Sequence, residues 1–375
     1  MSFKKIQTPS GIRITQPLVF IGIWVLLVFL IYAWLCSLSV QKVHEFREDA
    51  IKRHRDRMDP VKAEAHLTQP QDVIRHAAAS EVSVGIYLDH LSGFSIQDMY
   101  WEPNLFVWFR WKDPHLNPGE TFRILGGQIE SKEKLEEEIK DGFHYARYFV
   151  KVNINKSFNM SLFPVETHLM TIAIEDAVST SDVIRYVPDR ANTNLSSRLH
   201  FPAFSIQGHD LIEKPHSYKT NFGKDGLGQK GVVTHDEVVL GIGIERKGYG
   251  LYVKYFIGLF SATLIAMIAF FIKPTDVDPR FGLGVGGFFG AVANTLLSDG
   301  FIGQAETLCF IDIVNAIGLT TIFLSIVEST LSLYLYDILG QKVLSRKLDL
   351  FSAAIFGLVF ISMVLVLPWI ATQSV

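Results

Sequence analysis

The sequence predicts a membrane protein in which an extracytoplasmic all-β sandwich is followed by a four-helix transmembrane bundle, with one further transmembrane helix as an N-terminal anchor. Three observations lead to this fold class. Apolar residues are concentrated in blocks long enough to cross a bilayer, and the region between the first two blocks alternates polar and apolar residues. Clusters of basic residues also flank these blocks in a pattern that assigns each flank to one side of the membrane.

The chain of 375 residues contains five apolar blocks, and most of them reach the roughly 20 residues that cross a hydrocarbon core. The first block is longer than the apolar core of a signal peptide, and no A-x-A-like cleavage site follows it. We therefore expect residues 1–40 to hold a retained anchor, and the charged segment 41–80 to form a stalk. The five blocks are 17–38, 249–272, 281–297, 307–335 and 348–370.

The distribution of basic residues predicts the orientation of the chain. Lys4, Lys5 and Arg13 precede the first block, and positive residues favour the cytoplasmic side of a membrane. The β domain is then expected outside the cytoplasm. Both cysteines, Cys36 and Cys309, lie in apolar blocks, so we expect no disulfide in the polar domain. Together these features favour a multi-pass protein of a bacterial inner membrane.

The polar region 81–248 has the pattern of many short strands. Val82 to Leu88 alternate apolar and polar residues, as in a strand with one buried face. The acidic segment 131–141 is expected to be an exposed helical insert. Several short strands with turn signals between them predict a sandwich or barrel. Further strands are expected at 105–111, 145–155, 169–174, 201–206 and 238–244.

The third apolar block differs from an ordinary lipid-facing helix. Gly282, Gly286 and Gly290 recur four residues apart, so they fall near one side of a helix. Two interpretations remain open. The small residues could pack closely against a neighbouring helix, with Phe289 filling the core. Alternatively, the helix could line a pore that several copies of the chain enclose.

Several motifs, in their order along the chain, resemble those of the pentameric ligand-gated ion channels in their bacterial, disulfide-free form. The segments EVSVGIYL and FVWFRWKD resemble the opening strands of that family, and SFNMSLFPVETHLMTIAIED resembles its signature loop. DPRFGLGV resembles the start of the pore helix. The resemblance covers residues 81–370. It implies a ligand-sensing β domain over 81–248 and a four-helix channel-like domain over 249–375.

The resemblance also implies roles for individual residues. A ring of Phe289 side chains would form an apolar constriction that gates by dewetting. Acidic rings at the two mouths would favour cations, and Arg280 would oppose them. The implied pore-lining residues are Gly282, Gly286, Phe289, Ala293, Leu296 and Leu297. The implied charge rings are Asp276, Asp278, Arg280 and Asp299. The residues implied to couple sensing to the pore are Phe163, Pro164, Glu166 and Arg246.

Other candidates keep two interpretations. In the family, agonists bind between subunits in an aromatic pocket, for which Tyr186, Tyr218 and Phe222 are candidates here, although they could equally be ordinary strand-surface aromatics. Asp312 and Glu328 lie inside the fourth apolar block, where ionisable residues are costly and often functional, although Asp312 could simply lie near the outer interface.

An enzymatic function finds little support in the sequence. No HExxH, CxxC or glycine-rich phosphate loop is present, and the histidines lack metal-ligand spacing. We expect no catalytic residues, metal, cofactor or nucleic acid partner. The expected partners are membrane lipid, identical subunits in a pentamer and a small ligand or proton. The predicted function is a ligand- or proton-gated ion channel. The alternative is a non-conducting membrane receptor or scaffold of the same fold, because the pore helix lacks the Ser and Thr rings common in conducting members of the family.

Overall fold

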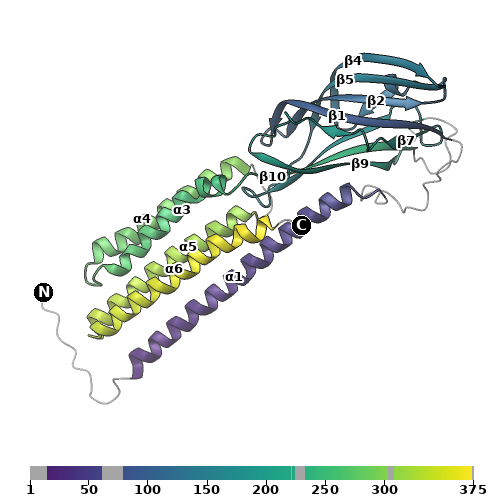
Figure 1. The fold of residues 1–375 in the computed structure, drawn as a ribbon. Helices are drawn as coiled ribbons and strands as arrows, with labels where there is room; N and C mark the ends of the chain where they lie inside the picture. The colour runs from purple at the N-terminus through teal and green to yellow at the C-terminus, as the bar shows by residue number, and fades with distance from the viewer. Residues whose placement is uncertain (1–14, 61–78, 221, 224–232, 303–307, 374–375) are drawn as a thin grey trace. The chain divides into compact units, whose positions relative to one another are not determined.

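The computed structural model describes residues 15–60, 79–220, 222–223, 233–302 and 308–373 (Figure 1). The chain divides into two compact units. The β unit comprises Glu48–Asn159 and Glu166–Gly248. The helical unit comprises Met1–Arg47, Met160–Val165 and Tyr249–Val375.

The β unit is built from two sheets. The first has the strand order β4-β5-β2-β1-β7, and β8 also pairs with β1. Its pairs are antiparallel, except that β7 and β8 run parallel to β1. The strands are β1 (Ser80–Ser95), β2 (Tyr100–Trp111), β4 (Gly127–Lys140), β5 (Phe143–Asn155), β7 (Ile184–Pro188) and β8 (Asn194–Leu195).

The second sheet is antiparallel and has the order β3-β6-β10-β9. Its strands are β3 (Phe122–Ile124), β6 (Thr167–Asp176), β9 (Phe204–Tyr218) and β10 (Val233–Arg246), and the short helix α2 (Pro118–Thr121) precedes β3.

One hydrophobic core is shared by the two sheets, so they pack face to face. In β1 every second side chain, from Val82 to Leu88, is fully buried in it. Trp101 and Phe109 of β2 reach the same core, as do apolar side chains of β6 and β10. The prediction of a β-rich region from period-two patterning is therefore confirmed, because the alternating residues are those that fill this core.

The acidic segment 131–141 was expected to be a helix, and this expectation is wrong. Residues 131–140 belong to β4, which pairs with β5 from Gly127 to Lys140 through two register shifts. Glu and Lys favour helices only weakly, by a few tenths of a kcal/mol each, so pairing along a long neighbouring strand overrides their preference.

The helical unit contains four helices C-terminal to the β unit (Figure 1). α3 contacts α4 and α5, α4 contacts α5, and α5 contacts α6. α5 continues through a turn of π-helix, Tyr334–Ile338, before α6 begins. The helices are α3 (Gly250–Ile268), α4 (Val277–Ile302), α5 (Phe310–Leu333) and α6 (Lys342–Thr372).

The glycines of α4 in the tightest contacts are not those that recur four apart, although an added Cβ on Gly290, one of that set, would lie 3.4 Å from the Cβ of Ala262. A Cβ atom on Gly287 would lie 2.7 Å from the backbone carbonyl oxygen of Ala262 in α3. A Cβ on Gly284 would lie 2.7 Å from the Ile326 side chain of α5. Neither position has room for a side chain. Glycine at these positions therefore lets the helices approach closely, as small residues do between membrane helices.

The N-terminal helix α1 (Thr15–Arg57) packs on the same helical unit. Trp24, Val28 and Tyr32 form a hydrophobic cluster with residues of α5 and α6. The Tyr32 hydroxyl donates a hydrogen bond of 3.1 Å to Thr321 Oγ1, and its ring meets the edge of the Phe356 ring. The first apolar block is thus a packed part of the bundle.

The charged end of α1 is more structured than a solvated stalk. From Glu48 onward it belongs to the β unit, and Met58 just beyond it packs against an apolar cluster that includes Ala173 and Val239. The Lys214 ammonium donates a 3.5 Å hydrogen bond to the Arg57 carbonyl. The remainder of the predicted stalk, residues 61–78, lies outside the described residues.

In the described part of the chain, four helices are long and apolar enough to cross a membrane. They are Ile21–Arg57, Gly250–Phe271, Phe310–Ile338 and Lys342–Thr372. α4 is a continuous helix but is not among these four, so its membrane crossing stays a prediction.

Candidate functional site

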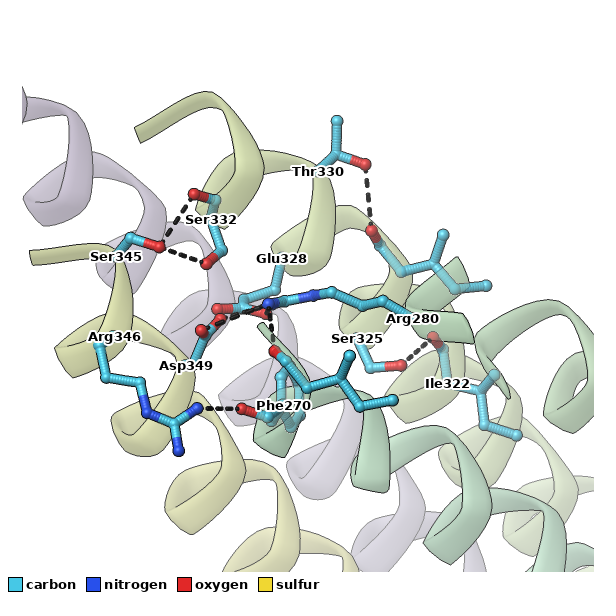
Figure 2. Close-up of polar contacts among 12 residues, drawn as sticks. Phe270, Arg280, Ile322, Ser325, Glu328, Thr330, Ser332, Ser345, Arg346 and Asp349 are labelled. Carbon is cyan, nitrogen blue, oxygen red and sulfur yellow. Dashed lines mark hydrogen bonds and ion pairs between the residues drawn. The ribbon is translucent and has the colours of Figure 1, made fainter. Parts of the chain in front are cut away.

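A fully buried cluster of three charged side chains joins α4, α5 and α6 (Figure 2). Arg280, near the start of α4, directs its guanidinium toward Asp349 of α6 and Glu328 of α5. The Arg280 Nη1 donates to Asp349 Oδ2 at 3.3 Å and to the Ile272 carbonyl at 3.1 Å. The Nη2 donates to Glu328 at 3.4 Å and to the other oxygen of Asp349.

The cluster has one positive and two negative groups. When all three are ionised, its formal charge is therefore negative. Arg280 Nε and Glu328 Oε1 have no hydrogen-bond partner among the described residues. Buried charges are stable only when they are paired and hydrogen-bonded, so Arg280 is the group on which both carboxylates depend.

Polar contacts around the cluster fix the turn between α5 and α6 and the end of α3 (Figure 2). The Ser332 and Ser345 hydroxyls lie 2.8 Å apart, and the Ser345 hydroxyl also donates to the Ser332 carbonyl. Arg346 donates to the Phe270 carbonyl at 3.0 Å. The helices that hold Glu328 and Asp349 are therefore tied together at the same end of the bundle.

This placement corrects the expected role of Arg280. A residue of a charged ring must face the aqueous mouth of a pore, whereas Arg280 is buried within its own helical unit. Asp276 and Asp278 are exposed at the start of α4, as a ring would require. The side chain of Asp299 lies outside the described residues.

The expected pore-lining residues form one face of α4 that the helical unit leaves uncovered. Phe289 is 67% exposed and Leu296 is 68% exposed. Gly282 and Gly286 have nothing within 4 Å of an added Cβ, and Ala293 is exposed. The side chain of Leu297 lies outside the described residues.

The opposite face of α4 is packed. Gly284, Gly287, Ala291 and Asn294 are all buried, and Asn294 Nδ2 donates to Asn315 Oδ1 of α5 at 3.4 Å. In this single subunit Phe289 does not fill the core, and the close packing of α4 is at Gly284 and Gly287 rather than at Gly282 and Gly286.

Two of the expected coupling residues form an ion pair in the β unit. Arg246, the last residue of β10, donates from Nε to Glu166 Oε1 at 3.1 Å, and its Nη2 binds the same oxygen. Its guanidinium also lies 4.2 Å from the centre of the Phe204 ring. Burial raises the pKa of Glu166, but His168 and Arg246 beside it have the larger combined effect and hold that pKa below its ordinary value.

The other two expected coupling residues, Phe163 and Pro164, belong to the helical unit. The Phe163 ring meets the Tyr255 ring of α3 edge-on, with 5.0 Å between centroids. The neighbouring Ser161 carbonyl accepts a 2.8 Å hydrogen bond from the backbone N–H of Phe310 at the start of α5. The tip of the signature-like loop is thus held by the helices.

The Glu166–Arg246 pair gives a prediction about pH. Glu166→Gln is expected to destabilise the β unit by about 3 kcal/mol at pH 7, because Arg246 loses its buried partner. Since the folded-state pKa of Glu166 is lowered, the stabilisation is present above its ordinary value of 4.5 and is lost as the pH falls through the lowered value. Thermal unfolding of both proteins between pH 3 and pH 8 measures the difference.

Burial also lowers the pKa of His168, so this ring too contributes a loss of stability as the pH falls below its ordinary value of 6.5. Because His168 is present in both proteins, the difference between them reports on Glu166. A difference between wild type and Glu166→Gln that is unchanged from pH 7 to pH 3 would contradict the ionic role of Glu166.

The three candidate ligand aromatics are not brought together. Tyr186 is fully buried in the core between the sheets, so its assignment to a ligand pocket is wrong. Tyr218 and Phe222 lie at the end of β9, with 5.5 Å between ring centroids. Phe222 is exposed and has a positive φ of 52°.

Tyr218 belongs to a polar cluster on the second sheet. Its hydroxyl donates a 2.7 Å hydrogen bond to Glu175 Oε1 on β6, and Arg123 Nε donates to the same oxygen at 2.6 Å. His216 Nδ1 lies 2.7 Å from Glu175 Oε2, and Glu237 of β10 is the register partner of Glu175. Burial raises the pKa of Tyr218, and its hydrogen bond to Glu175 raises it further.

The two ionisable residues of the fourth apolar block have different surroundings. Glu328 joins the buried cluster, whereas Asp312 accepts a 2.7 Å hydrogen bond from the backbone N–H of Cys309 at the start of α5. A carboxylate at this position caps a helix, so Asp312 has a structural role in the subunit.

Sequence reasoning missed Asp349, Glu175, His216 and Glu237, because their partners are distant in the sequence. The histidines have no metal-ligand spacing along the chain, yet strand pairing brings Glu175, His216 and Glu237 together. Comparison with known protein families and with curated proteins finds no match to this chain.

Proposed function

We propose that the chain is the subunit of a homopentameric, ligand- or proton-gated ion channel of a bacterial inner membrane. The observation that carries this proposal is the uncovered face of α4. Gly282, Gly286 and Ala293 leave space in front of the helix, and Phe289 and Leu296 project from it. A single copy cannot enclose a pore, whereas several copies around an axis bring these faces together.

The two faces of α4 support this assignment by their difference. The face with Gly284 and Gly287 is already used for close packing within the subunit. The other face has no packing partner among the described residues of the subunit and offers little side-chain area to lipid at Gly282 and Gly286. In lipid, helix association depends on close packing of small residues, so a further copy of the chain is a better partner than acyl chains.

The order of the units supports gating. Only Lys247, Gly248 and Tyr249 lie between the end of β10 and the start of α3, so a displacement of β10 has no long linker in which to dissipate. The proposed coupling path runs through the Glu166–Arg246 pair and the Met160–Val165 segment that is part of the helical unit.

Charge selectivity for cations is part of the proposal. Asp276 and Asp278 are exposed at the start of α4, and acidic rings favour cations. Arg280 would have opposed them, but its charge is withdrawn into the buried cluster with Glu328 and Asp349.

One observation favours the alternative, a non-conducting receptor or scaffold. The uncovered face of α4 has no hydroxyl side chain among Gly282, Gly286, Phe289, Ala293 and Leu296. Rings of Phe289 and Leu296 would be apolar, and a narrow apolar pore excludes water unless it widens.

Assembly and conduction test the proposal in two steps. Native mass spectrometry of the detergent-solubilised protein is expected to show five copies, and a stable monomer or dimer would exclude a channel. Planar-bilayer recording of the same sample across pH and salt is expected to show cation current. A well-folded pentamer that never conducts would instead establish the non-conducting receptor.

A further inference from the structure

A row of charged side chains crosses the outer face of the second sheet. Arg123 is the register partner of Glu175, Glu175 of Glu237, and Glu237 of Lys214. Directly opposite residues of neighbouring strands lie on the same face, with Cβ atoms about 5 Å apart. Two carboxylates are therefore adjacent in the middle of the row, an arrangement that repels unless a cation lies between them.

The two carboxylates are compensated unequally. Arg123 and Tyr218 bind Glu175 Oε1, and His216 lies against Oε2. Glu237 is only 7% exposed, and no hydrogen bond or ion pair to its side chain is found among the described residues. Burial raises the pKa of Glu237 to about 7. A buried carboxylate without a partner is costly, so this position favours either a proton or a cation.

We propose that Glu175, His216 and Glu237 bind a divalent transition-metal ion of the Zn²⁺ class. One ligand atom from each residue lies within 4.8 Å of the other two. Imidazole nitrogen and carboxylate oxygen are both ligands that Zn²⁺ accepts, and three protein ligands leave its fourth tetrahedral position open. Ca²⁺ and Mg²⁺ prefer six or more oxygen ligands, which this trio does not provide.

The arrangement needs a small adjustment to accept the ion. His216 Nδ1 and Glu175 Oε2 are 2.7 Å apart, a hydrogen-bond distance. Ligands of a tetrahedral Zn²⁺ at about 2.0 Å are roughly 3.3 Å apart, so the hydrogen bond is replaced by bonds to the metal as the two groups separate by a few tenths of an ångström.

The groups around the trio fit the supporting role of an outer shell. Arg123 and Tyr218 hold Oε1 of Glu175, which leaves Oε2 for the metal. Hydrogen bonds of this kind orient ligating carboxylates. The nearby cations Lys214 and Arg57 lower the charge on this face, and the Lys214 ammonium donates to the Arg57 carbonyl.

The site lies where β9 ends and β10 begins, because His216 is near the end of one strand and Glu237 near the start of the other. A bound ion would clamp β6, β9 and β10 together at this end of the sheet. Metal binding does not depend on the channel function, since it uses side chains of the β unit alone.

The test is isothermal titration of the untagged full chain in detergent, stripped with EDTA, using ZnCl₂ as the probe. Wild type is expected to bind one high-affinity Zn²⁺ per chain and to unfold at a higher temperature with Zn²⁺ than without it, because a ligand that binds the folded state stabilises it. CaCl₂ at the same concentration is expected to give neither signal.

Glu237→Gln and His216→Gln are each expected to weaken this affinity by at least about tenfold. His209→Gln is the matched control, because His209 is an exposed histidine on the same strand β9, and its affinity should equal that of wild type. Glu237→Gln keeps the size of the side chain and removes only its charge. Thermal unfolding of this variant without metal checks that it is folded.

The proposal is overturned if wild type does not bind Zn²⁺, or if His209→Gln weakens Zn²⁺ binding as much as the ligand variants do. It is also overturned if both ligand variants bind Zn²⁺ as tightly as wild type. Zn²⁺ binding by a protein that fails to conduct would contradict the proposed channel while leaving the metal site in place. Conduction without Zn²⁺ binding would do the reverse.

Discussion

Replacing Arg280 with methionine is expected to lower the free energy of unfolding of the helical unit by about 3–5 kcal/mol, the cost of leaving a buried charge without its partner. Arg280 is the only positive group in the cluster with Glu328 and Asp349 (Figure 2). Without it, two carboxylates face each other in the interior. Unfolding of the detergent-solubilised protein by added denaturing detergent, followed by tryptophan fluorescence, measures the loss.

The charge count predicts an order among three variants. Glu328→Gln removes the excess negative charge and leaves the Arg280–Asp349 pair. It is therefore expected to change the free energy of unfolding of the helical unit by no more than about 1 kcal/mol. Asp349→Asn removes the carboxylate that binds both terminal nitrogens of Arg280. Its loss in the free energy of unfolding is expected to lie between those of Arg280→Met and Glu328→Gln.

Arg346→Met is the control, because Arg346 lies at the same end of the bundle and donates one hydrogen bond, to the Phe270 carbonyl. Its expected cost is about 1 kcal/mol. If Arg280→Met costs no more than Arg346→Met, or if Glu328→Gln is the most destabilising of the four, the cluster does not depend on Arg280 as described.

Phe289→Ser is expected to raise the basal current of the proposed channel by on the order of tenfold or more. A tenfold rise corresponds to removing about 1.4 kcal/mol of free energy that favours the closed state. A ring of apolar side chains keeps water out of a narrow pore, and a small polar side chain lets water remain. Phe289 is 67% exposed on the uncovered face of α4. Planar-bilayer recording without added ligand measures the change.

Phe288→Ser is the matched control. Phe288 has the same side chain at nearly the same depth, but it lies about 100° further around the helix and is 36% exposed. It should leak less than Phe289→Ser. A leak in Phe288→Ser alone would mean that the pore face is assigned one position out of register.

Local sequence patterns predicted the elements more reliably than the site. The alternation from Val82 to Leu88 identified β1, because the polarity of each residue depends on whether it faces the core or the other side of the strand. The same reasoning failed for segment 131–141. Its Glu and Lys residues favour a helix, and pairing with β5, which decides the outcome, is not encoded locally.

The buried site could not be predicted in this way. Arg280 and Asp349 are 69 positions apart, and only helix packing brings them together. The motif that suggested a pore mouth at Arg280 describes a short segment, and it contains no information on the partner in α6. Similarly, Glu175 and Glu237 meet through strand register, which depends on the whole sheet.

The packing of α1 has a consequence for how the protein is made. The hydrogen bond from Tyr32 to Thr321 joins residues 289 positions apart. Because synthesis proceeds from the N-terminus, α1 is made well before its partners α5 and α6. Its packing face of Trp24, Val28 and Tyr32 therefore has no partner in the chain until both of those helices exist. Docking of α1 can occur only after α5 and α6 have been made.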